Sequence, residues 1–313
     1  MARRNPGSPN ANQPRYLDPA VLQKIQPLSL AAREVVEGVR VGMHKSPLRG
    51  FSTEFAQHRQ YVPGDELRHV DWRVYARSGR YYVKLFEAET NFNANMLLDA
   101  SSSMHFGGPR AEGGGSMTKL EYAKYLAASL AHLIVEQRDS VGLGVFDSEL
   151  RQYIEPKSTM SVIQHIAEQL EVVDAQPRTD VAAVLHDFAR RMPRRGFVVL
   201  FSDLLDNVDA FLQGINHLRY RGHNVIVFHV LDPHELTFPY TGTCRFEGLE
   251  LDGSMVTQPQ RIRAAYMQEL EAFLTRVRLA CERSRVDYVL ADTSRPIEAT
   301  LTGYLIARQR TVS

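Results

Sequence analysis

The sequence lacks the features that would mark a secreted, disulfide-bonded or membrane-spanning protein. Only two cysteines occur in 313 residues, Cys244 and Cys281, and their spacing matches no metal or redox motif. No apolar run approaches the roughly 18 residues that a membrane-spanning helix needs. The stretch MARRNPGSPNANQPRY has two arginines near its start, Arg3 and Arg4, but no apolar segment behind them, so we expect no secretory signal there. These absences favour a reducing compartment, and we expect a cytoplasmic location.

A strong excess of either charge is also missing. The chain holds 37 Lys and Arg against 36 Asp and Glu, although residues 1–90 hold 14 basic residues and only 9 acidic ones. A basic patch for nucleic acid is conceivable in that first part. Its basic residues are dispersed among acids, however, and they show no interleaved aromatic stacking pattern. We therefore expect no nucleic-acid partner.

What the chain does have, from residue 93 onward, is an alternation of short apolar runs with longer helical patterns. Strands are predicted at 93–99, 141–146, 150–154, 197–203, 224–231 and 287–292. Helices are predicted at 118–137, 160–170, 181–192, 207–220, 261–284 and 296–309. Such an alternation indicates βαβ units, and so a doubly wound, mostly parallel, Rossmann-type α/β sheet with helices on both faces.

Three parts of the chain depart from this pattern. Residues 1–19 are rich in Pro and Asn and are predicted to be a disordered leader. Residues 20–90 carry too little apolar mass for a core of their own, so we predict a helix/β appendage packed on the α/β domain at 91–310. That domain contains a Gly-rich loop at 105–117 and a β insertion at 232–258, with a turn at Asp252–Gly253.

The appendage contains the only tryptophan, Trp72, which we expect to be a buried anchor. It lies in a short helical turn in which Arg68 and Asp71, three residues apart, could form an ion pair. Alternatively, Arg68, Arg73 and Arg77 could contact an acidic partner. We favour the structural interpretation of these arginines, and the alternative stays open.

Two acidic residues follow directly on buried strands. Asp99 ends the apolar run of LLDASSSMHF and begins a D-x-S-x-S pattern with Ser101 and Ser103, and Asp203 ends FVVLFSD. In an open parallel sheet, ligands bind beyond the carboxyl ends of the strands. If the two strands are neighbours, both carboxylates face one crevice. A polar strand end without a ligand is the simpler alternative.

Thr179, at the start of the helix predicted at 181–192, could reach the same crevice, or could only cap that helix. Carboxylate and hydroxyl oxygens together suit a hard cation, Mg²⁺ or Mn²⁺. His229, Asp232 and Glu235 follow another strand end, either as support for this site or as ordinary polar loop residues. The Gly-rich loop lacks G-K-[ST], so we expect no nucleotide site. The serines lie in no G-x-S-x-G elbow, so we expect no catalytic serine.

These motifs resemble two known families. Asp99, Ser101, Ser103, Thr179 and Asp203 resemble the metal-ion-dependent adhesion site (MIDAS) of von Willebrand factor A domains. The stretch YVPGDELRHVDWRVYAR (61–77), followed by RYYVKLFEAE, LLDASSSM and LDPHELTFP (231–239), resembles the bacterial domain-of-unknown-function-58 family. The resemblance covers about residues 30–310. The long Gly-rich loop at 105–117 departs from the family's pattern, and it affects how exposed the metal would be.

The resemblance implies a von Willebrand factor A-like fold that is not an enzyme and whose metal binds an acidic side chain of a protein partner. It also implies that the protein works with a MoxR-type AAA+ ATPase, as an adaptor or assembly factor. The competing hypothesis is a metal-dependent hydrolase that uses the same acidic cleft. A hydrolase needs a general base near the metal, and His105 is the nearest candidate along the chain.

Overall fold

The computed structural model divides the chain into two compact units. One comprises Met1–Val35 together with Phe92–Ser313, and the other comprises Val36–Asn91. The structure describes residues 15–17, 19–28, 54–62, 70–87, 93–108, 117–176, 180–192, 195–205, 207–249 and 253–312. The predicted appendage at 20–90 is split between the two units. The helix Pro19–Ile25, at the start of that predicted appendage, belongs to the larger unit.

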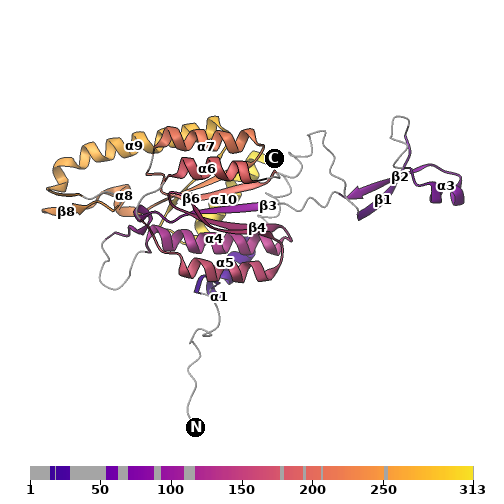
Figure 1. The fold of residues 1–313 in the computed structure, drawn as a ribbon, viewed down its shortest axis with the longest axis horizontal. Helices are drawn as coiled ribbons and strands as arrows, with labels where there is room; N and C mark the ends of the chain where they lie inside the picture. Colours follow the sequence, from indigo (N-terminus) through magenta and orange to yellow (C-terminus); the bar gives the residue numbers. More distant parts are fainter. Residues whose placement is uncertain are drawn as a thin grey trace, which may run out of the picture. The chain divides into compact units, whose positions relative to one another are not determined.

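The larger unit is built on a six-stranded sheet (Figure 1). Its strands are β3 (Asn93–Asp99), β4 (Ser140–Phe146), β5 (Leu150–Lys157), β6 (Phe197–Ser202), β7 (Asn224–Leu231) and β10 (Asp287–Asp292). They lie in the order β10-β7-β6-β3-β4-β5. All neighbours are parallel except β4 and β5, which form an antiparallel hairpin. The predicted α/β class with a mostly parallel sheet is confirmed.

The central strands are buried because helices cover both faces of the sheet. Every residue of β4 and β6 is buried, as the continuous apolar runs of the sequence predict for a parallel sheet. Figure 1 shows α6, α7 and α9 along one face and α4 and α5 along the other. The covering helices are α4 (Lys119–Glu136), α5 (Met160–Val172), α6 (Val181–Arg191), α7 (Val208–Tyr220), α9 (Pro259–Arg283) and α10 (Ile297–Val312). Between β6 and helices α6 and α7, Leu185, Phe188, Leu200 and Ile215 belong to one buried apolar cluster.

The segments 15–17 and 19–28 pack on α4 and its neighbours. The Tyr16 ring, in η1 (Arg15–Leu17), meets the edge of the Tyr125 ring with centroids 4.7 Å apart. Helix α1 (Pro19–Ile25) continues into η2 (Gln26–Leu28), and Ile25 is fully buried. These buried aromatic and aliphatic contacts explain why the segments belong to the larger unit.

The insertion after β7 contains a helix as well as the predicted β structure. Strands β8 (Cys244–Glu247) and β9 (Ser254–Thr257) pair antiparallel, and Gly248 N donates to Gly253 O at 2.9 Å. Asp252, in the predicted turn, lies outside the described residues. Before this hairpin, α8 (Pro233–Thr237) begins at Asp232, which forms a capping box with Glu235.

The smaller unit consists of a hairpin and a short helix. Strands β1 (Glu54–Gln60) and β2 (Tyr82–Glu87) pair antiparallel. Helix α3 (Trp72–Ser78) begins because the Asp71 carboxylate accepts from Arg73 N at 2.9 Å and Val74 N at 3.2 Å. It ends at Gly79, whose φ of 65° favours glycine. β2 lies within the RYYVKLFEAE stretch that carries part of the family resemblance, whereas nothing in the sequence analysis predicted β1.

Candidate functional site

The two predicted acidic strand ends lie on neighbouring strands. β3 pairs parallel with β6, and Leu98, just before Asp99, is the partner of Phe201. Counted along the chain from β3, the six strands lie in the order 3-2-1-4-5-6, so the winding direction reverses between β3 and β6. Ligands of doubly wound sheets bind at this reversal, beyond the carboxyl ends of the strands. The condition set by the sequence, that the two strands are neighbours, is therefore met.

The Asp99 carboxylate is completely buried and accepts hydrogen bonds from Ser101 and Ser202. Ser101 N donates to Asp99 Oδ1 at 2.9 Å, and Ser202 Oγ donates to Asp99 Oδ2 at 2.6 Å. Burial, with a smaller contribution from the negative charge of Asp203, raises the pKa of Asp99 to about 7. In the described residues no basic side chain lies within ion-pair distance of this carboxylate. The burial of this carboxyl group is therefore offset by hydrogen bonds and, among the described residues, by no ion pair.

Ser101 and Ser103 lie beside Asp99 at η4 (Ser102–His105), and their hydroxyl oxygens are 3.1 Å apart. Magnesium ligands lie at about 2.0–2.1 Å in an octahedron, which puts adjacent ligand oxygens about 3 Å apart. The two hydroxyls therefore have the spacing of adjacent Mg²⁺ ligands. No group of three or more His, Cys, Asp or Glu side chains suited to a metal occurs in the described part of the chain. The candidate donor set instead combines one carboxylate with hydroxyls, and it fits a small hard cation.

Thr179 lies outside the described residues, but the chain on both sides of it is placed. Gln176 N donates to Ala100 O at 2.9 Å and forms an isolated parallel bridge with Ser101. The N-cap of α6 is Asp180, whose side chain accepts from Ala183 N at 2.8 Å. The alternative that Thr179 caps this helix is therefore wrong.

Asp203 is engaged by a lysine that the sequence did not point to. Lys119 Nζ lies 2.7 Å from Asp203 Oδ2 and 2.7 Å from Glu235 Oε1, and the lysine side chain is fully buried. Lys119 is the first residue of α4, and the N-terminus of a helix disfavours a positive charge, so the helical pattern alone does not explain a lysine there.

His229 supports the backbone of Asp203. Its Nε2 donates to Asp203 O at 2.8 Å, which leaves Nδ1 to accept from Tyr288 Oη at 2.8 Å. Burial lowers the pKa of His229 to about 4. This histidine is therefore neutral, and both of its ring nitrogens are occupied.

Asp232 and Glu235, the predicted supporting residues, have different roles. Glu235 reaches Asp203 through Lys119, while its Oε2 accepts from Asp232 N at 2.8 Å. Asp232 accepts from Gly108 N at 3.2 Å, from Thr293 Oγ1 at 3.3 Å and from His234 N at 2.8 Å. Through these hydrogen bonds, Asp232 attaches Gly108, near the beginning of the Gly-rich loop, to the first turn of α8.

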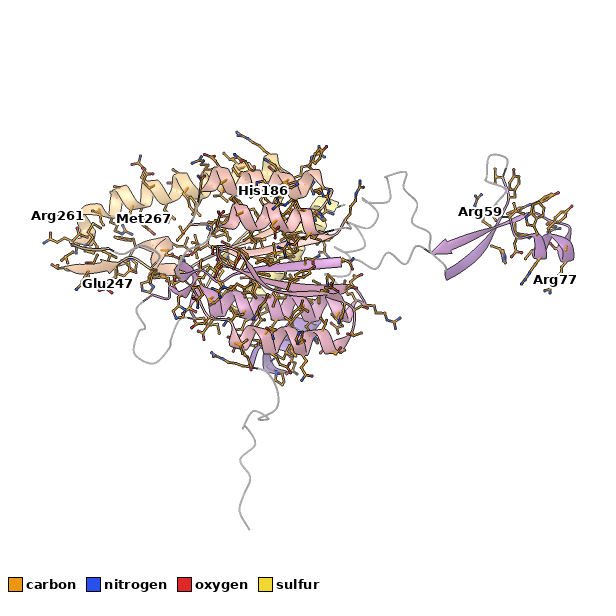
Figure 2. The ribbon with its side chains drawn as sticks, in the orientation of Figure 1. Arg59, Arg77, His186, Glu247, Arg261 and Met267 are labelled. Atoms are coloured by element: carbon orange, nitrogen blue, oxygen red, sulfur yellow. The ribbon has the colours of Figure 1, made fainter. Side chains whose placement is uncertain are left out.

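The predicted partner-binding arginines belong to the smaller unit. Arg68 lies outside the described residues. Arg73 and Arg77 are exposed on α3, and no ion pair to a described residue holds either of them. Figure 2 shows Arg77 on this helix. Within the smaller unit Trp72 is not a buried anchor, because its side chain is 57% exposed. Among the described residues of that unit, its ring makes an edge contact with the Tyr75 ring, with centroids 6.2 Å apart. Tyr75 in turn stacks on Tyr81 at 4.4 Å.

Comparisons with known proteins found similar sequences and similar solved structures. Curated relatives include uncharacterized proteins of Mycobacterium bovis and Mycobacterium tuberculosis, each 26% identical over 231 residues, which cover 72% of this chain and 69% of theirs. Similar solved structures include an aerotolerance-related membrane protein from Bacteroides fragilis (19% identity, TM-score 0.44, 69% of this chain and 99% of that one). Another is the conserved hypothetical protein BatB from Bacteroides thetaiotaomicron (17% identity, TM-score 0.44, 70% and 99%).

Among the described helices, none has the length and apolar character needed to cross a bilayer. Residues 57–273 match the family described as "Protein of unknown function DUF58". Because this match covers more than half of the 313 residues, the chain belongs to the DUF58 family.

Proposed function

We propose that this chain is a metal-dependent protein-binding module, and not an enzyme, whose Mg²⁺ or Mn²⁺ is held by Asp99, Ser101 and Ser103. The observation that carries the proposal is the fully buried Asp99 carboxylate, which has two serine hydroxyls beside it and no basic partner in the described residues. A cation at this point would offset a costly buried charge. Thr179 and Asp203 would take part directly or through water, as in the von Willebrand factor A domains that the motif resembles.

A protein carboxylate is the ligand that such a cation would recruit. A site with one carboxylate and neutral hydroxyls leaves the cation with net positive charge, and an external Asp or Glu is then a strong, charge-assisted ligand. The partner would accordingly be released when the metal is removed. On the family resemblance, a MoxR-type AAA+ ATPase is the first candidate, either as this partner or as the machine that works beside it.

The histidines near the site favour binding over hydrolysis. Metal-assisted hydrolysis requires a general base that can reach the attacking water. His229 is fully buried and both ring nitrogens are bonded, so it cannot accept that proton. The side chain of His105 is 60% exposed and lies 3.9 Å from Asp174, and no hydrogen bond to another described residue orients its ring.

The metal is tested by calorimetric titration of the full chain with Mg²⁺ and with Mn²⁺. We expect Asp99→Asn and Ser101→Ala to weaken binding at least about tenfold, as loss of a metal-site interaction typically does. Asp99→Asn should not lower the melting temperature in EDTA, because a neutral amide is cheaper to bury. Ser129→Ala is the matched control, because Ser129 is a buried serine of α4 whose hydroxyl has no hydrogen-bond partner among the described residues. Equal affinity in wild type and Asp99→Asn would contradict the proposal.

The partner is tested by capture of a purified MoxR-type ATPase, encoded in the same genome, on the immobilised chain. We expect wild type to retain it in Mg²⁺, and expect EDTA or Asp99→Asn to release it. Equal retention under all three conditions would mean that the metal does not hold this partner. If the purified protein instead hydrolyses phosphoesters in a way that depends on Mg²⁺ and Asp99, the hydrolase interpretation replaces this one.

A further inference from the structure

Lys119 is a cation built into the candidate metal centre. Its side chain is fully buried, and its ammonium lies 2.7 Å from a carboxylate oxygen of Asp203 and 2.7 Å from one of Glu235. The Phe106 ring, 5.7 Å from Nζ, lies on the chain that leads into the Gly-rich loop. Burial lowers the pKa of Lys119, but Asp203 and Glu235 outweigh burial and raise it above its usual value, so the ammonium stays charged.

Ordinary helix stability does not account for this arrangement. Thr118 caps α4 by accepting from Glu121 N at 3.1 Å, and the next residue, Lys119, brings a positive charge to the positive end of the helix. A buried charge also pays a desolvation penalty that its partners only partly return. Stability of the fold alone therefore gives little reason for a lysine at position 119. A lysine there does, however, offset the negative charge of Asp203, which lies beside Asp99.

Asp203 lies beside Asp99 at the ends of the paired strands β3 and β6, where the residue before it, Ser202, donates to Asp99 Oδ2 at 2.6 Å, so its charge acts on the Asp99 carboxylate. Whatever neutralises Asp203 therefore also weakens the attraction of this site for a cation. Lys119 does so through a short ion pair in a site from which water is excluded, where charge interactions are stronger than on the surface. It also fixes the direction of the Asp203 carboxylate.

We propose that Lys119 is a positioning residue that holds Asp203 out of direct metal coordination and offsets its charge, so that the cation is bound weakly until a partner carboxylate completes its shell. This inference rests on the proposed function and adds to it a reason why cation and partner would bind together. The affinity for the cation held by Asp99 and the two serines would then depend on the negative charge of the partner's carboxylate, because Lys119 offsets the negative charge of Asp203.

The test compares two lysines of the same helix. In Lys119→Met, Asp203 is left unpaired, and we expect calorimetry to show Mg²⁺ and Mn²⁺ binding at least about tenfold tighter than in wild type. Lys124→Met is the matched control, because Lys124 is also buried on α4 but its Nζ donates to a backbone carbonyl, Val173 O, at 2.6 Å. We expect no change in metal affinity for this control.

A purely structural role for Lys119 would give the opposite sign. If Lys119→Met binds Mg²⁺ equally or more weakly than wild type, this inference is overturned while the proposed metal centre stands. If neither wild type nor Lys119→Met binds Mg²⁺ or Mn²⁺, both this inference and the proposed metal centre are contradicted. Should Lys119→Met not fold, the variant Lys119→Met/Glu235→Gln removes one unpaired charge, and it should still bind Mg²⁺ more tightly than Glu235→Gln alone.

Discussion

Ser202 Oγ donates a 2.6 Å hydrogen bond to Asp99 Oδ2, which joins the ends of two neighbouring strands at the candidate metal centre. The same hydroxyl oxygen accepts from Leu204 N at 3.0 Å. Ser202 thus restrains the carboxylate and satisfies a buried backbone donor. Partners of this kind orient metal ligands, although they do not touch the metal themselves.

Ser202→Ala should weaken both metal binding and the fold. Loss of a partner of this kind typically costs 10–100-fold in metal affinity. The unpaired Leu204 N–H should cost about 1–3 kcal/mol of unfolding free energy. Calorimetry and denaturant unfolding measure the two effects. Ser202→Thr keeps a hydroxyl and is the control, and a Ser202→Ala variant with wild-type Mg²⁺ affinity would show that Asp99 needs no such restraint.

Trp72→Ala should change the melting temperature little. The side chain is 57% exposed, and its edge contact with Tyr75 is worth about 0.5–1.5 kcal/mol at most. Phe188→Ala is the comparison, because Phe188 is 1% exposed and its loss should cost about 3–5 kcal/mol. A fall after Trp72→Ala as large as that after Phe188→Ala would show that Trp72 is buried in solution.

The strands of the sheet could be predicted because most of them are continuous apolar runs bounded by polar residues. β3 and β7 have the predicted bounds. β1 was missed because EFAQHRQ has neither an apolar run nor a clear alternation, and its pairing with β2 is what makes it a strand. α8 could have been found from Asp232, Pro233 and Glu235, which form a capping box with proline at its first turn.

The candidate site was only partly visible in the sequence. Asp99 and Asp203 could be found because each directly follows an apolar strand, a local signal. Ser202 and Lys119 act through contacts between residues 103 and 84 positions apart, which no local pattern shows. Trp72 was misjudged because burial depends on what a side chain packs against, and its residue type alone does not decide that.

Acid should destabilise the fold partly through His223. Burial, aided by the positive charges of Arg221 and Arg195, lowers the pKa of His223 to about 4, against about 6.5 in an unfolded chain. Between these values the unfolded state takes up a proton that the native state does not. The free energy of unfolding should therefore fall as pH drops from about 6.5 to 4, by at most about 1.4 kcal/mol per pH unit for this residue.

His223→Gln removes this titration, so its unfolding free energy should fall less steeply than that of wild type across the same window. Urea unfolding at a series of pH values measures both slopes. His229, whose pKa burial also lowers to about 4, continues to contribute in the variant. Identical slopes for wild type and His223→Gln would mean that His223 takes up its proton equally in both states.

Gly108→Ala should disrupt the attachment of the Gly-rich loop to α8. A Cβ at Gly108 would lie 1.8 Å from His234 Nδ1, so the ring would have to leave Asp232, which its Nδ1 contacts at 3.0 Å. Overpacking of this kind costs about 1–3 kcal/mol, and denaturant unfolding should show that loss. Gly303→Ala is the control, because a Cβ there meets nothing within 4 Å and alanine favours the α10 helix by up to about 1 kcal/mol. The two substitutions should therefore move stability in opposite directions, and a Gly108→Ala variant as stable as Gly303→Ala would show that the loop is not anchored through Gly108.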